Sequence, residues 1–244
     1  MSKKILIQLL SMVILFQCGC IVTAHTRSIL SSHNESKFVN DGILDTRSLP
    51  PLGKGYRTYS YLGSALGRQY AHSLVIKTLE ETFSNLYEET GRTFDIAEIG
   101  HREGGTFQPH KTHQNGLSVD IMTPMMVDGN PSRLSTGPLS LWGYCWHINP
   151  DNNHLNGYGW DVSSTSTYPK LCPKISVESE KEVDFEMLKM LIQELSRVAK
   201  LNGGSVRYVI VAPSFVLPLK GVGKPLSTKS KIVHDDHIHV EFSF

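Results

Sequence analysis

The histidines of this chain are concentrated in two windows, and their spacing constrains both local structure and chemistry. Six of the eleven histidines lie shortly before Asp120 or near the C-terminus: His101, His110, His113, His234, His237 and His239. Alternate residues of a β-strand point to the same face, so His237 and His239 can reach one small centre while their apolar neighbours face a core. The spacing therefore predicts a strand that carries two imidazoles on one face.

Asp120 also alternates with apolar neighbours, Val119 and Ile121. An isolated carboxylate in such a strand is costly to bury unless it is ion-paired or bound to a metal. His113 lies seven residues earlier, and Gly116 between them can turn the chain so that the two side chains converge. Two imidazoles and one carboxylate form a typical catalytic zinc site, although other divalent metals accept the same ligands. A structural metal site or a pH-sensing cluster is the alternative.

Two amphipathic helices are predicted from apolar residues at spacings of three and four, over residues 71–91 and 185–201. Glycine follows each pattern, as is typical of a helix end. Four short apolar stretches predict strands: 94–99, 117–122, 207–212 and 237–242. The expected fold class is α+β, a small and mainly antiparallel sheet packed by two helices, with the metal site at the sheet.

The first 24 residues resemble a secretory signal. Lys3 and Lys4 precede an apolar run from Ile5 to Phe16, which is too short to span a bilayer comfortably. Cleavage after Ala24 suits an ordinary signal peptidase, whereas cleavage before Cys20 would make a lipoprotein with a lipid anchor on that cysteine. We expect an exported, periplasmic protein with a signal over 1–24, a polar tether over 25–60 and one catalytic domain over 61–244, without an integral membrane span.

Composition excludes several classes. Lys and Arg number 24 against 23 Asp and Glu, so no basic excess indicates a nucleic-acid partner. After removal of the signal, Cys145 and Cys172 remain, and an even pair in an exported protein predicts one disulfide. Two free buried thiols are the alternative.

The segment from about 127 to 172 is long and lacks periodicity, which is usual for functional or locally structured insertions. It holds a dense aromatic group: Trp142, Tyr144, Trp146, Tyr158 and Trp160. These side chains would either form the core of the insertion, which we favour, or line a groove for a peptide or sugar strand.

The sequence resembles a known family at these same histidines. His110-x-x-His113, the run His113-Gln114-x-Gly116-Leu117-x-Val119-Asp120 and the terminal His234-x-x-His237-x-His239 are similar to the penicillin-insensitive murein endopeptidases, relatives of lysostaphin-type and D-alanyl-D-alanine metallopeptidases. The likeness spans roughly residues 50–244. It does not extend to the family's cysteine framework or proline-rich tail, and the segment 139–172 has no evident counterpart.

The resemblance implies a role for each histidine. His113, Asp120 and His239 would bind one zinc ion, His237 would be the general base beside the attacking water, and His110 and His234 would line the substrate side. No H-E-x-x-H helix supplies a glutamate base, which makes His237 the economical choice. Arg102 is a weaker candidate for contact with substrate. We expect Asp235 and Asp236 to be solvated loop residues, with orientation of the histidines as the alternative.

The implied activity is hydrolysis of peptide cross-links in peptidoglycan, at a bond that involves a D-amino acid. A D,D-carboxypeptidase, an L-alanyl-D-glutamate peptidase and a non-catalytic, zinc-containing wall-binding protein are the alternatives. The sequence contains no G-x-S-x-G and no G-x-x-x-x-G-K-[ST] motif, so acyl-serine and nucleotide mechanisms have no support.

Overall fold

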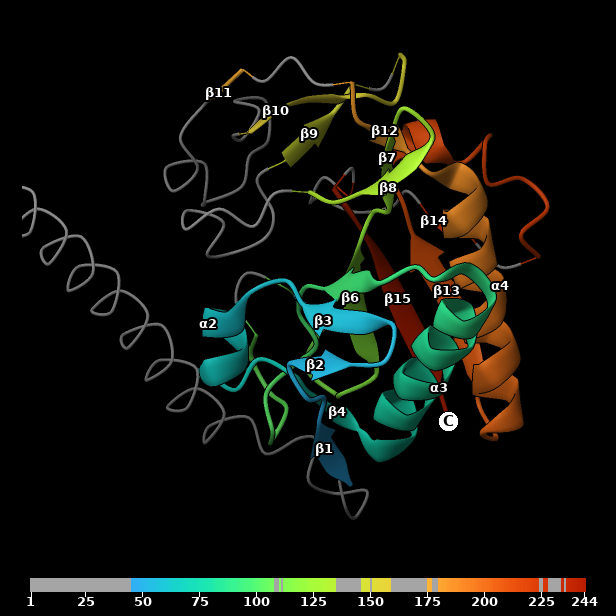
Figure 1. Ribbon diagram of the computed structural model, residues 1–244. Helices are drawn as coiled ribbons and strands as arrows, with labels where there is room; N and C mark the ends of the chain where they lie inside the picture. Colours follow the sequence, from blue (N-terminus) through green and yellow to red (C-terminus); the bar gives the residue numbers. More distant parts are fainter. Residues whose placement is uncertain are drawn as a thin grey trace, which may run out of the picture.

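Strands β6 and β15 lie side by side in the middle of a seven-stranded sheet (Figure 1). The computed structural model describes residues 45–107, 110, 112–134, 146–149, 151–158, 175–176, 180–223, 226–227, 234 and 236–244. The sheet order is β14-β13-β15-β6-β5-β3-β2, in which β13–β14 and β3–β5 are parallel and the other neighbours antiparallel. The fold is therefore α+β with a mainly antiparallel sheet, as predicted, although the sheet holds more strands than the four expected.

The described strands are β1 (Thr46–Ser48), β2 (Leu52–Gly53), β3 (Tyr56–Thr58), β4 (Tyr70–His72), β5 (Phe94–Ile96), β6 (Ser118–Met122), β7 (Met125–Val127), β8 (Asn130–Ser132), β9 (Trp146–Ile148), β10 (Leu155–Tyr158), β11 (Ile175–Ser176), β12 (Glu182–Val183), β13 (Ser205–Ile210), β14 (Leu226–Ser227) and β15 (His237–Ser243). The described helices are α2 (Tyr61–Ala65), α3 (Ser73–Thr90), α4 (Phe185–Leu201) and the 3-10 turn η2 (Pro213–Phe215).

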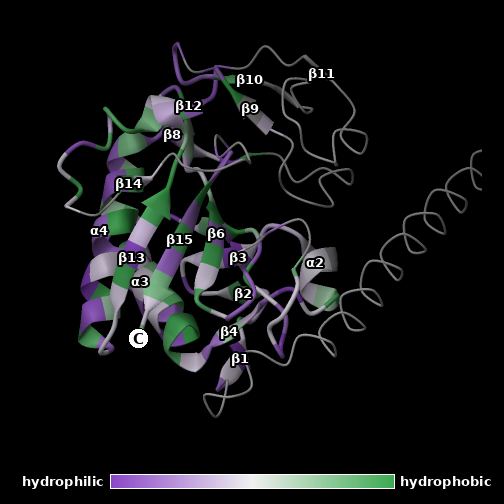
Figure 2. Ribbon diagram, turned by 180° about the vertical axis from the view of Figure 1, so that it is seen from behind, coloured by the Kyte–Doolittle hydropathy of each residue, from purple (hydrophilic) through white to green (hydrophobic). Residues whose placement is uncertain are grey.

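Helices α3 and α4 match the two predicted helices and cover one side of the large sheet (Figure 1). Helix α3 ends at Gly91, whose φ of 69° is the left-handed conformation that glycine adopts most readily. Helix α4 begins at Asp184, whose side chain accepts a hydrogen bond from the Met187 amide at 3.0 Å. Both colours of the hydropathy scale appear on α4 (Figure 2), as expected of a helix with one apolar and one polar face.

The apolar core lies between these helices and the sheet. It takes alternate residues of the central strands, so that Val119 and Ile121 of β6 pair with Val240 and Ile238 of β15. Phe83 of α3 packs against Phe94 of β5 at a ring distance of 5.4 Å. These alternations leave the remaining residues of β6 and β15 on the opposite face of the sheet.

Two predicted boundaries need correction. Strands β1 to β3 lie within residues 46–58, so the predicted polar tether over 25–60 overlaps the folded sheet in its C-terminal part. The predicted strand 94–99 ends at Ile96. Ala97 and Glu98 still make main-chain hydrogen bonds to Asp120 of β6, whereas the amide of Ile99 bonds to the carbonyl of Arg68.

Other predictions fall on residues outside those described: the signal over 1–24, the lipid anchor at Cys20, the Cys145–Cys172 disulfide, and the aromatic residues Trp142, Tyr144 and Trp160. Among the helices that the structure does describe, none combines the length and the apolar character needed to cross a membrane.

Candidate metal centre

The register of β6 and β15 brings the two histidine windows together. His239 lies directly opposite Asp120, and Glu241 lies opposite Ser118. Directly opposed residues of an antiparallel pair project from the same face with their Cβ atoms about 5 Å apart. Hydrogen bonding in the sheet thus joins segments that are more than a hundred residues apart in sequence.

His113 reaches this face from the turn before β6. Gly116, with a φ of 71°, reverses the chain as predicted, and its carbonyl accepts a hydrogen bond from the His72 amide at 2.9 Å. The His113 Nδ1 atom donates to the Ile99 carbonyl at 2.6 Å, which leaves the Nε2 lone pair free to act as a ligand. That Nε2 atom is buried, makes no hydrogen bond and lies 3.1 Å from Asp120 Oδ1.

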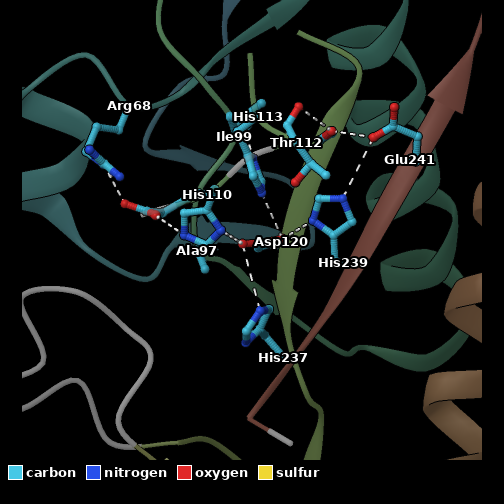
Figure 3. Close-up of polar contacts among 12 residues, drawn as sticks. Arg68, Ala97, Ile99, His110, Thr112, His113, Asp120, His237, His239 and Glu241 are labelled. Atoms are coloured by element: carbon cyan, nitrogen blue, oxygen red, sulfur yellow. Dashed lines mark hydrogen bonds and ion pairs between the residues drawn. The ribbon is translucent and has the colours of Figure 1, made fainter. Parts of the chain in front are cut away.

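Asp120 is the centre of the cluster (Figure 3). Its Oδ1 atom is 3.1 Å from His113 Nε2 and 2.8 Å from His239 Nδ1, while its Oδ2 atom is 3.7 Å from His110 Nδ1 and 3.8 Å from His237 Nε2. Burial opposes the charge of Asp120, but the nearby His113 and His237 hold the pKa of this carboxyl well below its ordinary value. Asp120 is therefore a buried carboxylate surrounded by imidazoles.

Each of these imidazoles contacts a further group. The carboxylate of Glu98 bonds to Arg68 and lies 3.0 Å from His110 Nε2. Burial would raise the pKa of Glu98, but Arg68 and His110 lower it to about 2. The Arg68 guanidinium also lies 3.9 Å from the centre of the Phe107 ring. His110 is thus held between two carboxylates, those of Glu98 and Asp120.

His239 is held in the same way by Glu241, whose Oε2 atom lies 3.7 Å from His239 Nε2 and accepts a hydrogen bond from the Ser118 hydroxyl. Burial would lower the pKa of His239, but the hydrogen bond to Asp120 and the nearby carboxylate of Glu241 raise it to about 9. In this arrangement Nδ1 of His239 faces Asp120, and Nε2 faces Glu241.

His237 bonds through Nδ1 to Asp236 Oδ1 at 2.6 Å. Burial lowers the pKa of His237, but Asp120 and Asp236 outweigh burial and raise it. Asp236 itself is 2% exposed, so the expectation of a solvated loop residue is wrong for this aspartate. Its burial is tolerated because both carboxylate oxygens have a hydrogen-bond donor beside them, His237 Nδ1 and the Trp146 amide. His234 joins the cluster through its ring, 4.7 Å from that of His237.

The cluster has the composition of a metal site. Among the described residues, His110, His113 and Asp120 offer ligand atoms that all lie within 4.8 Å of one another. His239 approaches the same Asp120 oxygen as His113 from the neighbouring strand. Bonds of 2.0–2.1 Å in a tetrahedron place ligand atoms about 3.3 Å apart. The observed separations of 3.1 and 2.8 Å around Asp120 Oδ1 are close to that value.

Sequence reasoning missed the carboxylates other than Asp120 that contact the histidines, Glu98 and Glu241, and the serine that bonds to Glu241. Glu241 and Ser118 were accessible to it, because each lies two residues from a predicted ligand on the same face of its strand. Glu98 carried no such signal, since its contact with His110 depends on the loop that follows β5. Arg102, a weaker candidate for substrate contact, is exposed on a turn, and Asp235 lies outside the described residues.

Comparison with known proteins agrees with this geometry. A family model described as penicillin-insensitive murein endopeptidase matches residues 38–167, more than half of the chain. The match includes His110, His113 and Asp120 and ends before the C-terminal histidines. No curated protein matches the chain.

Proposed function

Since the chain belongs to the penicillin-insensitive murein endopeptidase family, a family of peptide hydrolases, we propose that it is an exported zinc peptidase that cuts D-alanyl cross-links of peptidoglycan. The observation that carries the proposal is the buried Asp120 carboxylate, which contacts histidines from both sequence windows. A peptidoglycan substrate is implied by the family, and export is supported by the signal-like sequence of residues 1–24.

His113, Asp120 and His239 are the proposed zinc ligands. The buried Nε2 atom of His113 and the Nδ1 atom of His239 both point to one oxygen of Asp120. His110 is the other residue able to join a three-ligand set: its Nε2 atom faces Glu98, and its Nδ1 atom lies 3.7 Å from Asp120 Oδ2, farther than the 2.8 Å between His239 Nδ1 and Asp120 Oδ1. A zinc ion held here would supply Lewis acidity, which acidifies water and polarises the scissile carbonyl.

The remaining histidines would move protons and hold the substrate. His237 would accept the proton of the attacking water through Nε2, because its Nδ1 atom is engaged by Asp236. His110 lies beside His113 and His234 lies beside His237, with ring centres 4.7 Å apart in each pair. They would contact the peptide on the substrate side and favour the oxyanion as it forms.

Cell-wall peptides of known cross-linkage provide the test. The exported protein, with and without a chelator, is incubated with cross-linked dimers, and the products are identified by mass spectrometry together with the metal content of the protein. We expect conversion of dimers to monomers that stops when the metal is removed. Loss of a single terminal residue would select a carboxypeptidase, and bound metal without any cleavage would select a wall-binding protein.

A matched pair of variants makes this test specific to the site. His237→Ala removes the proposed base, whereas His154→Ala removes a partly exposed histidine that lies 3.7 Å from Glu182. We expect His237→Ala to retain the metal and lose activity by about 100-fold or more, as is usual for a general base, and His154→Ala to match the unaltered protein. Full activity of His237→Ala would contradict the assigned role.

A further inference from the structure

Asp236 joins two parts of the molecule. Its Oδ1 atom lies 2.6 Å from Nδ1 of His237, and its Oδ2 atom accepts a hydrogen bond from the backbone amide of Trp146 at 3.3 Å. Its own carbonyl accepts a hydrogen bond from the Thr123 amide, which directly follows β6. Both oxygens of one buried carboxylate are thus used, one by a site histidine and the other by the first residue of β9.

Trp146 begins a sheet of its own. Strands β9, β10 and β11 form a three-stranded sheet that lies apart from the large sheet in sequence and in space (Figure 1). The indole of Trp146 donates a hydrogen bond to the Tyr59 hydroxyl at 3.0 Å, and Tyr59 is 2% exposed in the core of the catalytic unit. Trp146 therefore connects the inserted sheet, β9 to β11, to the rest of the fold in two ways: through its main-chain amide to Asp236 and through its side chain to Tyr59.

We infer that Asp236 is a positioning residue that couples the inserted sheet to the orientation of His237. A carboxylate has only acceptor atoms, so the bond to Nδ1 places a proton there and orients the ring with its Nε2 atom toward Asp120. The Trp146 amide fixes the same carboxylate from the other side. The position of the inserted sheet thereby sets the direction in which His237 accepts a proton. Only the kinetic part of this inference rests on the proposed function.

Asp236→Asn separates this role from simple packing, because an amide has one acceptor and must present its NH2 group to one of the two donors. The direct readout is NMR of protein with 15N-labelled histidine, in which the His237 signals are identified by their loss in His237→Ala. We expect the Nδ1-protonated form in the unaltered protein and its loss in Asp236→Asn. An unchanged His237 tautomer would overturn the inference, even if no wall peptide is ever cut.

The kinetic readout requires an active protein. We expect Asp236→Asn to lower kcat by about 10- to 100-fold, with KM and metal content nearly unchanged. In a His237→Ala background the same substitution should have no further effect, because two residues that act as one unit are not additive. Additive losses, or loss of metal in parallel with kcat, would overturn the inference. Asp95→Asn is the control, since this buried aspartate bonds to Arg57 and Arg133.

The contribution of the inserted sheet is tested by a second pair, Trp146→Ala and Trp146→Pro. Both remove the indole, but only proline also removes the amide that bonds to Asp236. Proline is tolerated at the first residue of a strand, and Trp146 is that residue in β9. We expect kcat of Trp146→Pro to fall about 5-fold below that of Trp146→Ala, with the same change in His237 signals. If Trp146→Ala and Trp146→Pro have equal kcat values and equal His237 spectra, the inserted sheet does not influence the orientation of His237.

Discussion

The two faces of strand β15 are both buried, but one face stabilises the fold and the other carries the polar cluster. Ile238, Val240 and Phe242 face the helices and join the apolar core, whereas His237, His239 and Glu241 face the cluster around Asp120. Burial of the first set stabilises the fold, since apolar surface leaves water. Burial of the second set is costly unless every polar atom finds a partner. Alternate residues of one strand thus divide stability from chemistry.

The largest expected effect comes from the polar face. Asp120→Asn keeps the volume of the side chain but removes the charge that attracts His113 and His239. We expect cleavage of wall peptides to fall by about 10³-fold or more, as for other loss of a catalytic group, with metal content near zero. Atomic emission measures the metal, and circular dichroism should show a folded protein. An active, metal-loaded Asp120→Asn protein would contradict the division between the faces.

The neighbouring residue on the other face gives the opposite result. Ile121→Ala creates a cavity in a fully buried part of the core. We expect the free energy of unfolding to fall by about 2–5 kcal/mol, while the folded fraction still binds metal. Denaturant titration measures the first quantity, and metal analysis at low temperature the second. Loss of metal from folded Ile121→Ala would show that the two faces are not independent.

Glu241 sharpens the comparison because it lies on the polar face, beside the proposed ligand His239, without belonging to the proposed ligand set. One oxygen of Glu241 faces both the Ser118 hydroxyl and His239, so Glu241→Gln can keep that acceptor but removes the negative charge beside His239. We expect metal affinity to weaken by about 10- to 100-fold, with a small change in stability. Competition with a chelator of known affinity measures the effect. Unchanged affinity would limit Glu241 to a bond with Ser118.

The smallest expected effect lies where α4 meets α3, at a pair of side chains that belongs to neither face of β15. Glu194 bonds to Arg197 and to Asn85, and its hydrogen bond from Arg197, opposed by slight burial, lowers its pKa. The unfolded chain therefore binds more protons near pH 4, so this contribution is present above the ordinary pKa of glutamate and is lost as the pH falls.

Because Arg197 is exposed and Glu194 is only partly buried, water screens the pair, and Glu194→Gln should cost only a few tenths of a kcal/mol at neutral pH, and nothing in acid. Thermal unfolding at both pH values measures this, with Glu89→Gln on the exposed face of α3 as the control. A loss that persists unchanged in acid would assign the effect to helix packing.

Local periodicity was sufficient to predict both helices, the central strands and the face on which the C-terminal histidines lie. It could not predict strands β1 to β3, because these are two or three residues long and are stabilised by neighbours distant in sequence. The contact between Glu98 and His110, and that between Asp236 and Trp146, depend on loops whose path is set by packing. Sequence reasoning therefore identified the histidines of the cluster, but it missed Glu98 and Glu241 and gave the contact of Asp236 with a histidine only as an alternative.

The pairing of β6 with β15 also has a consequence for the order of events when the protein is made. Asp120 and His239 are 119 positions apart, and His239 lies on β15, which follows all the other described strands in sequence. Contacts at such separations form late in folding, because a long loop must close first. A nascent or C-terminally shortened chain therefore lacks half of the cluster. On the proposed function, the chain would therefore gain peptidase activity only when β15 has joined the sheet.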